Sequence, residues 1–354
     1  MLFNLLLLLV PAALVLHYLV HASPLAIFLT GALAIVPLAE WVRRATEQLA
    51  KMAGPAIGGL LNVTFGNAPE FILALFVLST GSTAVVKGQI TGAIIGNGLL
   101  GLGLAVVVGT WGREHLAFHR ERAGELSTLL ILSVIALLIP ALFDYTERGL
   151  YNAKNVADLD EKLSLGVSVL LIAIYVANLF YTLWTNRDVF AIKHQKEAPA
   201  WSVWQAVAVL CLATAATAWV SEVVSDALTA TATVLGLTPF FLGVIALAVV
   251  GNVAEYVSAI YFARRQEMTL ALSITVGSTI QIALLVAPLL VVASFFMGYP
   301  MNLVFRNPLE LIAIAAVAFI VNAIAHDGRV TWFEGVLLLV VYAMLALAFF
   351  FATP

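Results

Sequence analysis

Long apolar runs, separated by short polar stretches, extend along the chain from residue 2 to residue 352. A helix needs about 20 mostly apolar residues to cross a bilayer. Runs of this length predict eleven spanning helices, at residues 2–20, 24–43, 55–80, 88–110, 124–145, 163–185, 202–224, 238–263, 269–296, 307–325 and 331–352. The connections are short, so we expect an all-α membrane protein without a separate soluble domain.

The composition supports this expectation, because 62% of the residues are hydrophobic and 10% are charged. Soluble domains carry about 25% charged residues. The net charge of −3, without a basic stripe, argues against a nucleic-acid partner. The single cysteine, Cys211, lies in an apolar run and matches no disulfide, redox or metal motif. The expected surroundings of the chain are therefore the lipid bilayer.

The distribution of basic residues predicts the orientation of the helices. Of the 17 Lys and Arg residues, 12 lie in the loops after the second, fourth, sixth, eighth and tenth helices. This places the N-terminus in the cytoplasm and the C-terminus on the opposite side, in the inner membrane if the source is prokaryotic. The first apolar run lacks a basic leader and a cleavage site, so we expect a retained helix.

The chain contains an internal repeat with an offset of 185 residues. The segment "GNAPE" at 66–70 matches "GNVAE" at 251–255, and the same offset relates Gly92 to Gly277 and Glu125 to Glu310. We predict an N-terminal helix (1–22), a first five-helix repeat (23–186), a cytoplasmic linker (187–200) and a second five-helix repeat (201–354). Because five is odd, the two repeats should have inverted topologies, with a site near the midplane.

Each repeat places an amide and a carboxylate three residues apart: Asn67 with Glu70, and Asn252 with Glu255. Residues at i and i+3 lie on one face of a helix. A charge at the bilayer centre costs roughly 2.5–3.5 kcal/mol on insertion scales. The two carboxylates therefore need neutralisation, either by protons or by one divalent cation, and should titrate as a coupled pair.

The predicted ligands are all oxygen atoms, which suits Ca²⁺ better than zinc or copper. Pro69 should free the backbone carbonyl of Phe65 beside the site, as an additional ligand. Gly66 and Gly251, which precede the asparagines, allow close approach of the backbone. The sequence therefore predicts a cation site with Glu70, Glu255, Asn67 and Asn252 as ligands.

Further polar residues are candidates for a supporting role. Ser278 and Gln281 are three residues apart in "SITVGSTIQIALL", and Asn97 lies beside the repeat partner of Gln281. They would orient the glutamates, or simply form hydrogen bonds between helices. Glu40 and Glu222 lie near helix ends. They would line entry paths for the cation, or their charged side chains would simply extend to the lipid–water interface.

The segments "ATEQLAKMAGPAIGGLLNVTFGNAPEFI", "GQITGAIIGNGLL", "GNVAEYVSAI" and "SITVGSTIQIALL" resemble the calcium/cation antiporter superfamily, in its cation/proton exchanger branch. The resemblance covers nearly the whole chain. It implies Ca²⁺/H⁺ exchange by alternating access, with Glu70 and Glu255 binding both ions and Asn67 and Asn252 assisting. It also implies that Ser278 and Gln281 line the site, and that Ca²⁺ is a transported substrate, without any cofactor.

Alternative functions remain open on the sequence. A sodium-coupled exchanger would use the same site, whereas a cation channel would carry flux without a counter-ion. A membrane enzyme is disfavoured, since no nucleophile or histidine ligand set accompanies the glutamates. The oligomeric state is open, with a homo-oligomer among the options. Glu310 in "NPLE" fits a helix cap, with Asn307 as the N-cap and Pro308 at the first helical position.

Overall fold

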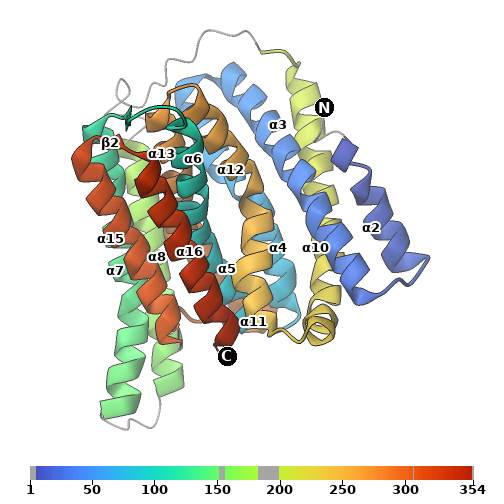
Figure 1. Cartoon of the computed structure of the whole chain (residues 1–354). Coiled ribbons are helices and arrows are strands. Elements are labelled where there is room, and N and C mark those ends of the chain that lie inside the picture. The colour runs from blue at the N-terminus through green and yellow to red at the C-terminus, as the bar shows by residue number, and fades with distance from the viewer. Residues whose placement is uncertain (1–4, 151–155, 182–198, 306, 353–354) are drawn as a thin grey trace. The chain divides into compact units, whose positions relative to one another are not determined.

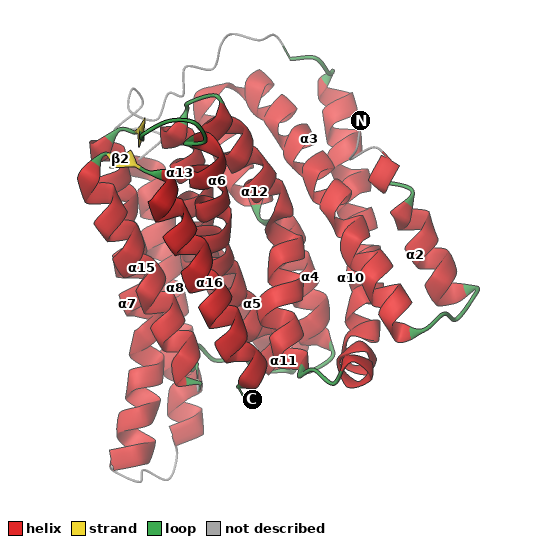
Figure 2. Ribbon diagram, in the orientation of Figure 1, coloured by secondary structure: helices red, strands yellow, loops and turns green. Residues whose placement is uncertain are grey.

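The structure, a computed structural model, describes residues 5–150, 156–181, 199–305 and 307–352. Helices make up nearly all of this part of the chain (Figure 2). The chain divides into two compact units, Met1–Thr80 with Ile172–Leu235, and Gly81–Leu171 with Gly236–Pro354.

The helices are long and apolar enough to form a membrane protein. Among the described residues, nine segments could cross a bilayer: Pro24–Ala53, Thr83–Gly109, Arg120–Arg148, Val156–Phe180, Val203–Leu235, Pro239–Arg264, Met268–Met297, Pro308–Asp327 and Trp332–Phe351. Two shorter apolar helices, Leu9–Tyr18 and Ala68–Ser79, accompany them. The predicted all-α membrane fold with about eleven helices is confirmed.

The first unit is built around two long helices, α3 (Pro24–Gly66) and α10 (Val203–Leu235), which pack along each other (Figure 1). A Cβ atom at Gly31 would lie 2.7 Å from Cγ2 of Val224, so the glycine permits this close approach. Helices α2 (Leu9–Tyr18) and α4 (Ala68–Ser79) pack against this pair. The two long helices contain segments 24–43 and 209–228, which the offset of 185 relates, so equivalent parts of the two predicted repeats pack together here.

The second unit holds most of the remaining helices. Its elements are α5 (Thr83–Ile95), η1 (Gly96–Gly101), α6 (Leu102–Gly109), β1 (Leu116–Ala117), α7 (Arg120–Asp144), η2 (Tyr145–Leu150), α11 (Pro239–Phe241), η4 (Leu242–Leu247), α12 (Ala248–Arg264), α13 (Met268–Gln281), η5 (Ile282–Val286), α14 (Ala287–Met297), α15 (Pro308–Asp327), β2 (Arg329–Val330) and α16 (Trp332–Phe351). Helix α8 (Val156–Phe180) begins in this unit and ends in the first. The elements labelled η are π-helical segments, which the sequence did not predict.

Glycines bring the helices of the second unit close together. A Cβ atom at Gly92 on α5 would collide with the backbone carbonyl oxygen of Val244 in η4. The same atom at Gly98 would collide with the side chain of Val317 on α15. Helix packing through small residues is typical of membrane proteins, because lipid supplies no hydrophobic force between helices.

Loop contacts define the two ends of the second unit. Strands β1 and β2 form an antiparallel pair, with Leu116 opposite Val330, and join two loops that are both predicted to lie on the cytoplasmic face. At the other end, a Cβ atom at Gly81 would lie 3.3 Å from the ring of Tyr299. The loops around Gly81 and Tyr299 are both predicted to lie outside. The pairing of loops therefore agrees with the predicted alternation of faces.

Several helix ends follow local rules that the sequence carries. Ser23 and Thr238 accept hydrogen bonds from backbone N–H groups at the starts of α3 and α11, each before a proline at the first helical position. Asn307 caps α15 through a hydrogen bond from the Leu309 N–H, as predicted. Thr331 forms a capping box with Glu334 at the start of α16.

The compact units do not coincide with the predicted repeats, because each unit takes helices from both halves of the sequence. The repeat boundaries, including the N-terminal segment 1–22, stay a prediction. Residues 1–4 and most of the predicted linker 187–200 lie outside the described residues.

Candidate functional site

The first Asn–Glu motif lies at a break between two helices of the first unit. Helix α3 ends at Gly66, Asn67 follows with φ −101° and ψ 20°, and α4 begins at Ala68. Glu70 therefore belongs to the first turn of α4. Free N–H groups at a helix N-terminus stabilise negative charge. Both side chains of the motif are buried, with Asn67 at 5% and Glu70 at 3% exposure.

This break differs from the single helix predicted over 55–80, and the predicted polar connection at 44–54 is instead helical. The interruption comes two residues before Pro69, whose ring excludes the carbonyl four residues back and which has no N–H. The carbonyl of Phe65 accepts a hydrogen bond from the Asn67 N–H instead. A carbonyl oxygen has a second lone pair, so Phe65 keeps the capacity proposed for it as an additional ligand.

The second motif lies within the uninterrupted helix α12 of the second unit. Asn252 and the preceding Gly251 are buried, and Glu255 is partly buried one turn further on. The side-chain Nδ2 of Asn252 donates a hydrogen bond to the carbonyl of Ala248, 2.8 Å away. The second repeat has Ala254 where the first has Pro69, and this explains why only the first motif lies at a helix break.

A buried hydrogen-bond network connects three helical segments around Asn252. Nδ2 of Asn97, in η1, donates to Oδ1 of Asn252 at 2.6 Å and to Oγ of Ser278, on α13, at 3.0 Å. Asn97 and Asn252 are fully buried, and Ser278 is 6% exposed. The structure thus brings together three of the residues that the sequence singled out, all within the second unit.

Gln281 is the last residue of α13 and directly precedes the π-helical segment η5. Adding 185 to the bounds of η1 gives 281–286, which overlaps η5 (Ile282–Val286). The two π-helical segments therefore occupy equivalent positions in the two predicted repeats. π-Helical turns occur frequently at functional sites. Here one contains Asn97 and the other directly follows Gln281.

Tyr256, next to Glu255, is a residue that sequence reasoning missed. Its ring is buried against η1, where a Cβ atom at Gly101 would lie 2.5 Å from Cδ1 of Tyr256. A Cβ atom at Gly96 would collide with the tyrosine hydroxyl. Gly96 and Gly101 indicated close helix packing in the sequence. No local pattern identifies Tyr256 as the residue packed against them, because it is 155 or more positions away.

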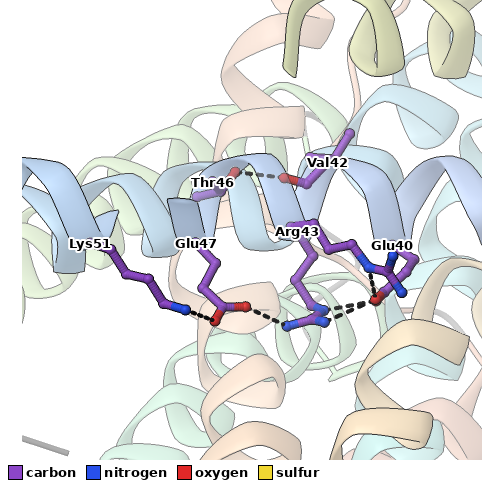
Figure 3. A network of polar contacts seen from close by, with 7 residues as sticks. Glu40, Val42, Arg43, Thr46, Glu47 and Lys51 are labelled. Atoms are coloured by element: carbon purple, nitrogen blue, oxygen red, sulfur yellow. Dashed lines mark hydrogen bonds and ion pairs between the residues drawn. The ribbon is translucent and has the colours of Figure 1, made fainter. Parts of the chain in front are cut away.

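The two candidates for entry paths belong to the first unit. Glu40 is 6% exposed and accepts hydrogen bonds from Nε and Nη2 of Arg43, at 2.8 and 3.0 Å, and from Nε of Arg44, at 2.6 Å (Figure 3). Arg43 also reaches Glu47, which pairs with Lys51 at 3.3 Å. These contacts give Glu40 a structural role in α3. Glu222, by contrast, is exposed on α10.

The model of the family described as "Sodium/calcium exchanger protein" matches residues 23–184 and 205–351. The chain belongs to this family. The match spans both predicted repeats and omits the region between them. It covers the two Asn–Glu motifs as well as Asn97, Ser278 and Gln281.

Individual members of the family are similar over nearly the whole chain. A protein of Aphanothece halophytica named Ca(2+)/H(+) antiporter is 41% identical, over 98% of this chain and 95% of its own length. The Ca(2+)/H(+) antiporter ChaA of Bacillus subtilis is also 41% identical, over 94% of both chains. The solved structure of native YfkE superposes with a TM-score of 0.84 at 36% identity, covering 99% of this chain and 100% of that one. The resemblance to the cation/proton exchanger branch is thereby confirmed.

Proposed function

We propose that the protein moves Ca²⁺ across the membrane in exchange for protons, by alternating access. The observation that carries this proposal is the 41% identity, over nearly the full length, to two proteins named Ca(2+)/H(+) antiporter. The description of the family mentions sodium/calcium exchange. The names of these relatives instead favour coupling to protons over coupling to sodium. Transport of an ion, rather than chemical conversion, also fits a chain composed of spanning helices.

Glu70 and Glu255 are proposed to bind both ions, with Asn67 and Asn252 supplying amide oxygens. Support comes from the burial of Glu70 in the first turn of α4 and from the network that fixes Asn252. Protonated carboxylates release a cation, and a bound cation displaces protons, so one pair of groups couples the two fluxes. Ca²⁺ enters as a transported substrate.

Asn97, Ser278 and Gln281 are proposed to orient the site from the second unit. Asn97 donates a hydrogen bond of 2.6 Å to Asn252. Loss of a group that orients a metal ligand typically lowers metal affinity by about 10–100-fold. Phe65, Pro69, Gly66 and Gly251 shape the backbone next to the asparagines. Glu222 remains a proposed entry-path residue. For Glu40, the ion pairs with Arg43 and Arg44 favour a structural role over the entry-path role.

The proposed orientation has the N-terminus in the cytoplasm and the C-terminus on the opposite side. The β1–β2 pair supports it, because the two loops that it joins both belong to the more basic set. A homo-oligomer is compatible with the many large apolar side chains exposed on the helices, such as Phe296 and Phe319.

Uptake of ⁴⁵Ca²⁺ into proteoliposomes tests the function. An imposed pH gradient is compared with an equal Na⁺ gradient while an ionophore clamps the voltage. We expect uptake driven by the pH gradient, and its loss in Glu70→Gln and in Glu255→Gln. Glu114→Gln, in an exposed loop, is the matched control. Uptake driven by Na⁺ alone would overturn the coupling ion, flux that ignores both gradients would indicate a channel, and transport retained in either variant would overturn the site.

A further inference from the structure

The second unit contains a cavity of about 310 Å³ at the end where α5 begins. Its charged lining residues are Lys87 on α5 and Glu310 on α15, and the segment between α14 and α15 contributes Asn302 and Val304. This cavity is separate from the Asn97–Asn252–Ser278 network, and nothing in the proposed exchange cycle uses it. The lining is otherwise formed by apolar side chains and by Thr83 and Asn307.

The ammonium group of Lys87 is held by oxygen atoms. Nζ donates hydrogen bonds to Oδ1 of Asn302 at 2.6 Å and to the backbone carbonyl of Val304 at 2.9 Å. Both acceptors belong to a segment that is itself buried, because Met301 and Val304 are 1% exposed and Phe305 is 2% exposed. Lys87 therefore places a positive charge on oxygen atoms that a cation could coordinate.

Glu310 adds a carboxylate to the oxygen-bearing groups that line the cavity. Glu310 is 4% exposed, and its Oε1 accepts a hydrogen bond of 3.0 Å from Oγ1 of the fully buried Thr91. A buried carboxylate needs a compensating positive charge, and Lys87 lines the same cavity.

The arrangement is confined to one repeat. Under the offset of 185, Lys87 corresponds to Leu272 and Thr91 to Val276, both apolar. The partner of Glu310 is Glu125, whose side chain is 43% exposed and lies 4.0 Å from Arg122. The equivalent helix in the other repeat forms with Leu272 at this position, so helix formation does not require a lysine here.

We propose that this cavity is a cation site that the chain fills itself, with the Lys87 ammonium in place of a metal ion. Carboxylate, amide and carbonyl oxygens are the ligands that Ca²⁺ prefers, and water would complete its shell of 6–8 oxygens. With Lys87 present, the cavity retains no divalent ion. Under the proposed orientation it lies on the outer face, so exported Ca²⁺ finds no second carboxylate site there; this consequence alone depends on the proposed function.

Equilibrium binding of ⁴⁵Ca²⁺ to the full chain in detergent at about pH 8 tests the proposal. The background is Glu70→Gln/Glu255→Gln, so that binding at the proposed transport site does not contribute. Adding Lys87→Ala should create one Ca²⁺ site with a Kd of about 1 mM or below, comparable with extracellular calcium modules. Adding Glu310→Gln as well should abolish it, and Lys87→Arg should not create it.

A folded Lys87→Ala protein that binds no more Ca²⁺ than its background would overturn the proposal, as would added binding that survives Glu310→Gln. Thermal unfolding establishes that the variants fold. If Lys87→Ala does not fold, Lys87→Gln removes the charge while keeping a donor for Asn302 and Val304, and the same two outcomes apply. Binding that persists in the background itself would instead contradict the proposed transport site, so the two failures are distinguishable.

Discussion

The side-chain amide of Asn97 donates a hydrogen bond to Oδ1 of Asn252 across 155 positions of sequence, at 2.6 Å. Asn97 lies in a π-helical segment and Asn252 on the helix that carries Glu255. The contact therefore fixes one amide of the proposed site.

Asn97→Ala should weaken Ca²⁺ binding by about 10–100-fold, as for other groups that orient metal ligands. The variant removes the Nδ2 group of Asn97 that donates a hydrogen bond to Oδ1 of Asn252. Apparent affinity is read from the Ca²⁺ dependence of uptake. Ser278→Ala is the matched control, since Asn97 keeps its bond to Asn252, and its effect should be smaller. Unchanged affinity in Asn97→Ala would show that the network is only structural.

Ca²⁺ affinity should fall as the pH falls, because protons and Ca²⁺ compete for the same carboxylates. Each proton displaced changes the apparent affinity by about tenfold per pH unit, and the dependence should level off at high pH. Equilibrium binding between about pH 6 and about pH 9 measures this slope. An affinity independent of pH over that range would separate the proton site from the Ca²⁺ site.

Gly92→Ala should destabilise the protein, because the added Cβ would collide with the Val244 carbonyl and lie 2.7 Å from Cβ of Ala248. Backbone cannot give way as a side chain can, and overpacking typically costs about 1–3 kcal/mol. Thermal unfolding in detergent measures the effect. Gly124→Ala on α7 is the control, since its Cβ would meet nothing within 4 Å. Equal melting temperatures for the two variants would contradict the packing described for α5.

Glu40→Gln should lower thermal stability while leaving Ca²⁺ affinity unchanged. Breaking a buried ion pair costs up to about 3–5 kcal/mol, and less is expected here because the side chains of Arg43 and Arg44 are 35% and 39% exposed. Glu47→Gln, whose side chain is 40% exposed, should cost about 0–1 kcal/mol. A weaker apparent Ca²⁺ affinity in Glu40→Gln without loss of stability would support the entry-path role instead.

Much of the candidate site could be predicted from local patterns. The two Asn–Glu motifs are recognisable because carboxylates are rare in apolar runs, and the offset of 185 relates them. Asn97, Ser278 and Gln281 were also singled out, and Asn97 forms hydrogen bonds to both Asn252 and Ser278. The helix break at Asn67 was not predicted, although Pro69 carried the signal, because a proline near a helix start and one in a helix interior look alike in sequence.

The sequence by itself determined the membrane class, the number of apolar segments, the repeat and the residues most suited to bind a cation. These properties depend on hydropathy and on spacing along one chain, so they require no knowledge of distant neighbours. The caps at Asn307 and Thr331 are local in the same sense.

Only the tertiary structure decided which residues face each other. Gly92 and Gly277 are equivalent in the repeat, yet a Cβ atom would collide with Val244 at the first and meet nothing within 4 Å at the second. Lys87 and Glu310 line one cavity although they are more than 200 positions apart in the sequence. Such pairings result from helix packing, in which small shape differences between equivalent segments select different partners, and no local pattern encodes them.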